Sequence, residues 1–336
     1  IGDADLTSEI VSCLSSRQIN LGGTVDGAHA LTVNGTTKFK GEIGGTLPLT
    51  SLTTEGGESS PYFCTTLGAN VTTTGDQTFG TPVTILFDTT FKGGNISLSR
   101  IIGGGPTFDQ NVEFDFTGTT TIQNAIAGDQ FINIVDLTVI GDAGLNGTIA
   151  TTGNQSYGGD VGVLGNTALT AGSGAISLGT GGEVVGATMN ETLTLGDAVQ
   201  TGGVTLGGAS EVTLGGLNIG AGAFDLSIGA VDNGAVSSNS PVEVLNNGTL
   251  TLTSDVSDSS SVIAFAGGLN ATEPSSIGLA AIVGTDNSSI HLGNVTYTGP
   301  ASGDYAFAVL TTGDFLSMGE NFTGGNITIE SLDTSD

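Results

Sequence analysis

Apolar and polar residues alternate along many short stretches of this chain. In a β-strand successive side chains point to opposite faces of the sheet, so alternation with a period of two predicts strands that are buried on one face. Glycine or asparagine bounds each stretch, as expected for strands separated by tight turns. The clearest examples are Leu31–Val33, Phe114–Phe116, Phe131–Val135, Phe224–Ile228, Leu250–Leu252 and Ile327–Ile329.

The chain also contains an internal repeat. Residues 67–91 and 145–169 align without a gap at an offset of 78. Both copies carry a Thr-Thr-Gly-x-Gln-x-aromatic-Gly segment, at Thr73–Gly80 and Thr151–Gly158. Units of this kind bury their apolar face only against the next unit. We therefore predict an all-β fold, an elongated β-solenoid of the parallel β-helix type, in which a unit of about 80 residues holds three or four stacked coils.

A shorter motif indicates that the coils differ in length. A tetrapeptide of the form apolar-Ser/Thr-Leu-Gly begins at Ile176, Leu193, Val204 and Val212, with spacings of 17, 11 and 8 residues. Such irregular spacing argues against a strict hexapeptide helix and favours coils with uneven loops. The same strands and turns also suit β-sandwich units that exchange a strand between subunits, and this alternative stays open.

Residues 5–15 are the one candidate for a helix. Leu6, Ile10, Val11 and Leu14 fall on one helical face. A short helix at this position would close the exposed backbone of a solenoid's first coil. The alternative is an extended arm that pairs with a neighbouring subunit.

Composition favours a single long domain over two smaller ones. We divide the chain into a cap or arm over residues 1–30, a β-strand-repeat domain over residues 31–300, and apolar C-terminal strands over residues 301–336. The last part is the most apolar region and is a candidate assembly segment.

The charge of the chain is strongly negative and unevenly distributed. Its 336 residues include 33 carboxylates and only five basic residues, giving a net charge of −28. The 236 residues after Arg100 hold 24 of the carboxylates and no lysine or arginine. This balance excludes nucleic-acid binding by phosphate neutralisation and attraction to anionic lipid. The basic residues are Arg17, Lys38, Lys40, Lys92 and Arg100.

The acidic surface leaves two interpretations open. It keeps the protein soluble, or it binds cations such as Ca²⁺ through surface carboxylates. The stretch Gly220–Leu226 loosely resembles a Ca²⁺-binding nonapeptide, but it occurs once and is one residue too long. We predict no other cofactor. No apolar run approaches the roughly 18 residues of a membrane helix, so we expect no membrane span.

The Thr-Thr-Gly-x-Gln segments, together with Asn34–Gly41, resemble the repeats of large bacterial β-strand-repeat surface proteins, the filamentous-haemagglutinin-like or autotransporter-like adhesins. The resemblance covers residues 24–180, and the rest of the chain only by composition. It implies a secreted, elongated, mainly β protein at the cell surface that serves adhesion, a matrix or a fibre. Because the chain is much shorter than those proteins, we expect it to assemble with copies of itself, unless it is a fragment.

Signatures of catalysis are missing from the sequence, and we predict that the protein is not an enzyme. His29 and His291 have no second candidate ligand at a metal-binding spacing, and no nucleophile or phosphate-binding motif is present. The enzymatic alternative is a polysaccharide hydrolase, which needs two or three carboxylates in a cleft. The candidates for that role are Asp109, Glu113, Asp115 and Asp129.

Two kinds of covalent modification are open. Cys13 and Cys64 are either a disulfide or two free thiols. Twelve Asn-x-Ser/Thr triplets are candidate N-glycosylation sites. They begin at Asn34, Asn70, Asn95, Asn146, Asn154, Asn190, Asn247, Asn270, Asn287, Asn294, Asn321 and Asn326.

Three functional hypotheses follow in order of preference. The first is a structural extracellular protein whose subunits join into a cell-surface fibre, sheath or matrix, with itself as the main partner. The second is an adhesin that presents loops to glycans or other surface components. The third is the polysaccharide hydrolase.

Overall fold

The computed structural model divides the chain into two compact units, Ile1–Asn154 and Gln155–Asp336, which we call unit 1 and unit 2. The only regular secondary structure in the described residues is β-strand. The described residues are 8–11, 18–55, 65–104, 109–122, 131–179, 182–207, 211–230, 235–254, 262–280, 282–284, 290–292, 295–297, 307–312, 316–317, 322–323 and 326–331.

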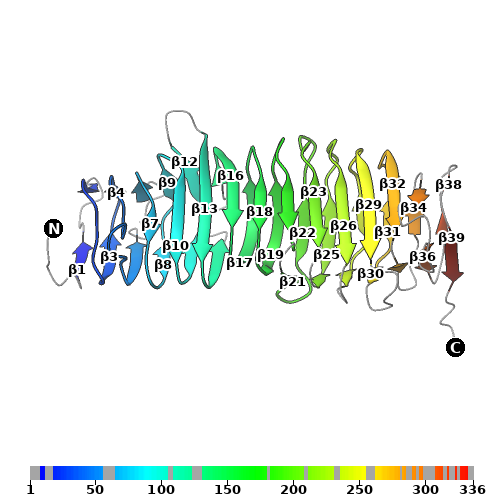
Figure 1. Ribbon diagram of the computed structural model, residues 1–336, viewed down its shortest axis with the longest axis horizontal. Helices are drawn as coiled ribbons and strands as arrows, with labels where there is room; N and C mark the ends of the chain where they lie inside the picture. The colour runs from blue at the N-terminus through cyan, green and yellow to red at the C-terminus, as the bar shows by residue number, and fades with distance from the viewer. Residues whose placement is uncertain are drawn as a thin grey trace. The chain divides into compact units, whose positions relative to one another are not determined.

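Unit 1 consists of three ladders of parallel strands, stacked side by side (Figure 1). The first ladder is β2 (Ile19–Leu21), β4 (Thr37–Phe39), β6 (Thr65–Leu67), β9 (Val83–Ile85), β12 (Ile101–Gly103) and β15 (Phe131–Ile132). The second is β7 (Val71–Thr72), β10 (Thr89–Gly93), β13 (Gln110–Phe116) and β16 (Ile134–Val139). The third is β1 (Ser8–Val11), β3 (Ala30–Asn34), β5 (Ser51–Glu55), β8 (Gln77–Phe79), β11 (Ile96–Leu98), β14 (Thr119–Ile122) and β17 (Asp142–Ala150).

The chain of unit 1 visits the three ladders in turn and returns one step further along. Strands β9, β10 and β11 form one coil, and β12, β13 and β14 form the next. In the third ladder Leu31 pairs with Leu52, Leu52 with Gln77, and Gln77 with Ile96. These steps of 21, 25 and 19 residues are the uneven coils that the tetrapeptide spacing predicts.

Unit 2 also has three parallel ladders. One is β18 (Gln155–Tyr157), β20 (Ile176–Leu178), β23 (Val204–Gly207), β26 (Leu226–Ala230), β29 (Thr249–Ser254), β32 (Ser276–Ala280), β35 (Val295–Tyr297) and β38 (Phe322–Thr323). The other two both begin on the long strand β19 (Val161–Thr170). One continues through β21 (Val184–Gly186), β24 (Val212–Leu214), β27 (Val236–Ser238), β30 (Val262–Phe265), β33 (Ile282–Gly284), β36 (Phe307–Thr312) and β39 (Asn326–Ser331). The other continues through β22 (Thr192–Leu195), β25 (Gly216–Ile219), β28 (Val242–Val244), β31 (Leu269–Ala271), β34 (Ile290–Leu292) and β37 (Leu316–Ser317).

The predicted fold class is confirmed, because the strands of both units stack in parallel as a β-solenoid. A sandwich of hairpin-connected strands pairs antiparallel, so that alternative does not describe either unit. The prediction of a helix over residues 5–15 is wrong for Ser8–Val11. These residues form strand β1, which pairs with β3 of the same chain. The β-branched residues Ile10 and Val11 favour a strand, and β3 offers them a ladder.

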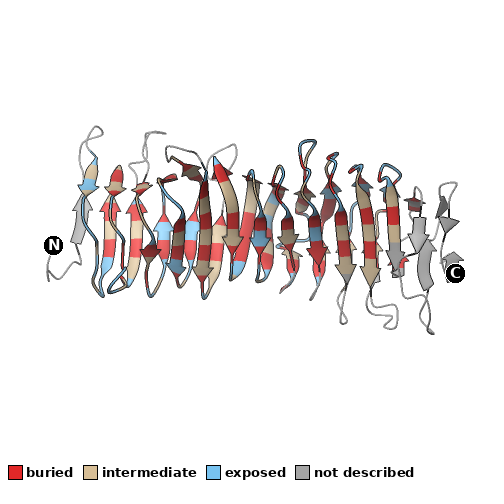
Figure 2. Cartoon of the chain, turned by 45° about the horizontal axis from the view of Figure 1, so that its top comes forward, coloured by how far each residue is buried: buried red, intermediate tan, exposed pale blue. Residues whose placement is uncertain are grey.

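Alternating burial along the strands forms the core (Figure 2). In β13 the residues Gln110, Val112, Phe114 and Phe116 are buried, whereas those between them are half-buried. The register between neighbouring strands then places similar side chains next to each other on successive coils, as where Phe91 pairs with Phe114. The ring centroids of these two side chains lie 5.3 Å apart. Phe79 contacts Phe91 edge to face at 5.7 Å, and Phe116 lies 6.4 Å from Phe114. Four aromatic rings thus form a column within the core of unit 1, which we call the aromatic column.

Aspartate and asparagine side chains at the corners connect each coil to the next. The side-chain oxygen of each accepts a hydrogen bond from a backbone N–H that lies 18 to 26 residues further along, on the following coil. We call these side chains the corner acceptors. They are Asp26, Asn70, Asp76, Asp88, Asn95, Asn111, Asp136, Asp160, Asn166 and Asp225.

The internal repeat builds the same corner twice. The Thr73 hydroxyl donates to the Gly75 carbonyl at 2.6 Å, and the Thr151 hydroxyl donates to the Gly153 carbonyl at 2.8 Å. The buried amide of Gln77 donates to the Lys92 carbonyl at 2.9 Å. Gln155 makes the equivalent bond to the Thr170 carbonyl at 2.7 Å. Both partners keep the offset of 78, so the repeated sequence specifies a repeated hydrogen-bond network.

The apolar-Ser/Thr-Leu-Gly tetrapeptide forms a short strand that ends at or just before its glycine. Its apolar residue and its leucine are buried, as Ile176 and Leu178 are, while the Ser/Thr between them points outward. In three of the four copies the glycine has positive φ, at +70° in Gly179, +73° in Gly196 and +96° in Gly207. At Gly207 a side chain is also excluded sterically, because a Cβ atom there would lie 2.0 Å from the Gly229 carbonyl oxygen of the next coil.

The aromatic column generates the first prediction. Phe114→Ala removes a ring that is fully buried, so we expect it to reduce the free energy of unfolding by about 3–5 kcal/mol. Phe87→Ala is the matched control, since Phe87 is 60% exposed and its loss should change stability by less than about 0.5 kcal/mol. Denaturant unfolding followed by circular dichroism measures both. Equal effects of the two substitutions would contradict the stacking of Phe114 in the core.

Candidate functional site

The outer surface of unit 1 has a polar hollow, which we call the trough. It crosses strands β10, β13 and β16, which lie side by side in Figure 1, and has a volume of about 440 Å³. The residues that line it are Asn70, Asp88, Thr89, Thr90, Asn111, Val112, Glu113, Asp136 and Thr138.

Corner acceptors form one side of the trough. Asn70 Oδ1 accepts the Thr90 N–H at 2.9 Å, and Asp88 Oδ1 accepts the Asn111 N–H at 2.9 Å. Asn111 Oδ1 in turn accepts the Asp136 N–H at 3.2 Å. These bonds join successive coils, so the main work of these amide and carboxylate oxygens is structural.

A second row of polar side chains in the trough has a different character. Thr90, Glu113 and Thr138 are register partners on three successive strands, and all three are half-buried on the outer face. Their strands lie about 4.8 Å apart, so a hydroxyl, a carboxylate and a second hydroxyl side chain follow one another across the three strands. Phe87 directly precedes the trough residue Asp88, and it is the one exposed aromatic side chain among those that the structure describes. Sequence reasoning missed the row and Phe87.

The carboxylates proposed for hydrolysis do not share a cleft where the structure describes them. Glu113 and Asp115 lie two residues apart on the outer face of β13. Asp115 forms an ion pair with Lys92 at 2.5 Å, and this hydrogen bond raises the pKa of Lys92. Asp109 is exposed and accepts a hydrogen bond from Gln110 at 3.3 Å. Asp129 lies outside the described residues.

The stretch compared with a calcium nonapeptide has a structural task. Phe224 is buried, and Asp225 Oδ1 accepts hydrogen bonds from the Thr249 backbone N–H at 2.9 Å and the Thr249 hydroxyl at 2.7 Å. These bonds lower the pKa of Asp225. Within the described ranges, no three His, Cys, Asp or Glu side chains are grouped so as to hold a metal ion. His29 is exposed, and the side chain of His291 is not described.

The candidate glycosylation sites that the structure describes are accessible. Strand alternation places the asparagine and the hydroxyl residue on one face, as where Asn95 and Ser97 are exposed and Ile96 is buried. Asn70, Asn95, Asn154, Asn190, Asn247 and Asn270 are exposed, and Asn34 and Asn146 are half-buried. Asn287, Asn294 and Asn321 lie outside the described residues, as do both cysteines, Cys13 and Cys64. Asn326 lies on β39, without a described side chain.

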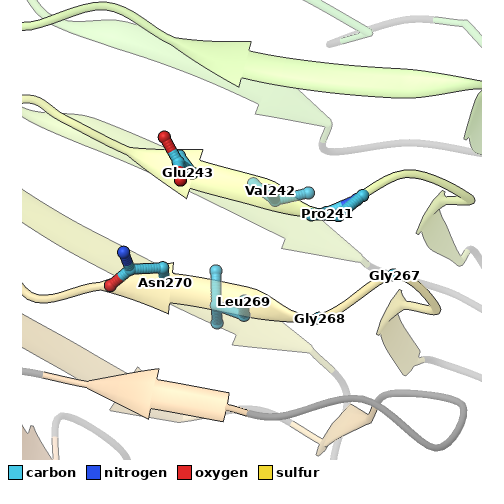
Figure 3. Close-up of a pocket in the computed structure, with 7 residues that line it drawn as sticks. All are labelled: Pro241, Val242, Glu243, Gly267, Gly268, Leu269 and Asn270. Atoms are coloured by element: carbon cyan, nitrogen blue, oxygen red, sulfur yellow. The ribbon is translucent and has the colours of Figure 1, made fainter.

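A smaller hollow of about 190 Å³ lies on unit 2 (Figure 3). Glu243 and Asn270 are register partners on β28 and β31, and both are exposed. Pro241, Val242, Gly267, Gly268 and Leu269 complete the hollow. With one carboxylate and one amide as its polar side chains, it offers less chemistry than the trough.

Glu191 holds a strained loop between β21 and β22. Its carboxylate accepts hydrogen bonds from the Thr188 hydroxyl at 2.5 Å, the Thr188 N–H at 2.9 Å and the Asn190 N–H at 3.2 Å. These bonds enclose Met189, whose φ of 62° is in the left-handed region that favours glycine. The hydrogen bond from the Thr188 hydroxyl, with that from its amide, lowers the pKa of Glu191 to about 2.

The two end strands are the remaining candidate surface. Among the described residues, β1 pairs only with β3, and β39 pairs only with β36. The pairing of β39 extends over six positions, from Asn326 to Ser331. An edge strand presents unpaired N–H and C=O groups and is a template for another strand.

Comparisons with protein-family models, with curated proteins and with solved structures found no match to this chain. In the part of the chain that the structure describes, no helix has the length and apolar character needed to cross a membrane.

Glu191 generates a prediction of pH dependence. Its pKa falls from about 4.5 in the unfolded chain to about 2 on folding, so its stabilising contribution is complete above pH 4.5 and is lost as the pH falls towards 2. Glu191→Gln should therefore be less stable than the wild type at pH 7, and the difference should shrink towards pH 2. Denaturant unfolding at several pH values measures this difference.

The comparison with wild type at each pH matters because other carboxylates repel one another less as they become protonated, which acts in the opposite direction. Glu243→Gln is the control, since Glu243 is an exposed strand residue on the same unit. A Glu191→Gln difference that stays constant from pH 7 to pH 2 would show that the carboxylate does not support the loop.

Proposed function

We propose that this chain is a structural protein of the cell surface that assembles with copies of itself by continuing its stack of coils. The observation that carries the proposal is the pair of end strands, β1 and β39, each with one edge that has no strand partner among the described residues. Between its first and last described strands, each ladder continues by parallel pairing from coil to coil.

The energetics favour growth at these edges. A further coil satisfies several backbone N–H and C=O groups, at a net gain of about 0.5–1.5 kcal/mol for each hydrogen bond, and covers apolar residues at the end of the core. Association through other surfaces is less favourable, because unit 2 has 18 carboxylates and no lysine or arginine. Repulsion between such surfaces opposes lateral clustering. The extracellular location in this proposal rests on the resemblance of the repeats to surface proteins.

Proline substitutions in β39 test the proposal. Successive residues of a strand direct their N–H groups to opposite edges, so Thr328→Pro and Ile329→Pro remove donors from different sides of the strand. We expect one variant to be destabilised, because its missing donor faces β36. The other should keep the wild-type melting temperature and lose assembly, as measured by sedimentation and electron microscopy.

Thr328→Ala and Ile329→Ala serve as controls, since they keep both backbone donors. A wild-type chain that stays monomeric at all protein and salt concentrations would overturn the proposal. So would normal assembly by both proline variants.

A second candidate function, the binding of a neutral glycan, is favoured by the trough. Sugars pack a C–H face on aromatic rings and hydrogen-bond to hydroxyl and carboxylate groups, and Phe87 with the Thr90–Glu113–Thr138 row offers both. We expect Phe87→Ala to weaken binding roughly tenfold in a glycan-array or calorimetric titration. Ile140→Ala, another exposed apolar position on unit 1, should have no effect. Absence of glycan binding by the wild type would remove this candidate.

A further inference from the structure

We infer that copies of the chain join head to tail, with β39 of one copy pairing in parallel with β1 of the next. This inference rests on the proposed function and adds to it the contacting strands and the polarity of the assembly. Three observations support it, from register, from strand direction and from charge.

The register of the end strands allows the two edges to fit. Ile10 of β1 is paired with Val33, which is fully buried. At the other end, Ile329 of β39 is paired with Leu310, which is itself paired with the buried Val283. Placing Ile329 opposite Ile10 therefore continues an aliphatic column. A shift by one residue would exchange the buried and exposed faces, so the alternation selects this register or one two residues away.

Strand direction favours the same arrangement. Every strand pairing that the structure records is parallel. A head-to-tail junction repeats the step between coils, so all three ladders continue together and the corners stay in line. A junction related by two-fold symmetry reverses the chain direction and forces all the strands to pair antiparallel. Head-to-tail contacts are also the type that generates open-ended filaments.

The charges at the two ends disfavour a filament built from contacts between like ends, because such a filament needs tail-to-tail junctions. Residues 282–336 contain seven carboxylates and no lysine or arginine, a net charge of −7. Residues 1–55 contain six carboxylates and three basic residues, a net charge of −3. Repulsion grows with the product of the charges. A filament of head-to-tail junctions thus repels less than one that alternates head-to-head with tail-to-tail junctions, because each of the latter brings two ends of −7 together.

Cysteine trapping tests the polarity. In a Cys13→Ser, Cys64→Ser background, one variant carries Glu9→Cys on the head, and a second, of different size through a fused tag, carries Thr328→Cys on the tail. These two positions lie directly opposite each other when Ile329 lies opposite Ile10. Neighbouring parallel strands bring Cα atoms within disulfide range, and a short thiol-reactive cross-linker tolerates a register shift of a residue or two. We expect cross-linked pairs of mixed size to be at least tenfold more abundant than pairs of equal size.

Each other outcome has a distinct meaning. Equal-sized pairs from Thr328→Cys or Glu9→Cys alone would overturn the head-to-tail inference and leave self-assembly standing. Filaments in electron micrographs without any cross-link would show that β1 and β39 are not at the junction, and would overturn it as well. Absence of both filaments and cross-links would overturn the proposed function itself. Variants must melt like the wild type, and Val11→Cys with Glu330→Cys, the next pair of opposed positions in this register, is the replacement pair if they do not.

Discussion

The hydrogen-bonded ladder between successive coils is the constraint on which the rest of this structure depends. Within one coil the chain moves from one ladder to the next, so a strand finds its partners only in the coils before and after it. Every strand N–H and C=O group must be satisfied across that spacing of about 4.8 Å. The close approach explains why Gly207 tolerates no side chain, and why corner residues such as Asp88 and Asn111 reach to the following coil. Among the described residues, β1 and β39 have a strand partner on one side only.

Alternation and repetition carried most of the information about the fold. The period of two identified strands such as those around Phe114 and Leu250, because each has one apolar face and one polar face. The repeat predicted three to four coils in its period. Following the strand pairing from Gln77 through three successive coils leads to Ala143, whereas Gln155, the equivalent of Gln77 in the second copy of the repeat, lies twelve residues further along. The period is therefore not a whole number of coils, and the loop lengths that decide this leave no pattern in the sequence. At Ser8–Val11 the helical spacing of apolar residues led to a wrong prediction, because strand pairing with β3 outweighed it.

The candidate site was less predictable than the fold, for a physical reason. Glu113 could be singled out as a carboxylate, but its neighbours Thr90 and Thr138 are 23 and 25 residues away and meet it only through the coil register. Asp225 was considered as a calcium ligand, whereas its carboxylate bonds to the backbone and hydroxyl of Thr249. Sequence identifies which chemical groups are present. The variable coil length decides which of them meet.

The acidity of the chain and its open edges belong to one physical arrangement. Several carboxylates are corner acceptors, and the N–H groups they accept from hold the pKa of Asp26 and of Asp225 below the ordinary value. Protonation of these two carboxylates therefore weakens the contact between coils. Carboxylates on adjacent coils lie within the screening length of about 8 Å, so the sides of the stack stay mutually repulsive at physiological salt. Backbone pairing, by contrast, acts at hydrogen-bond distance and depends little on salt. This contrast supports the proposed association along the stack of coils, which is the direction in which the fold itself is built.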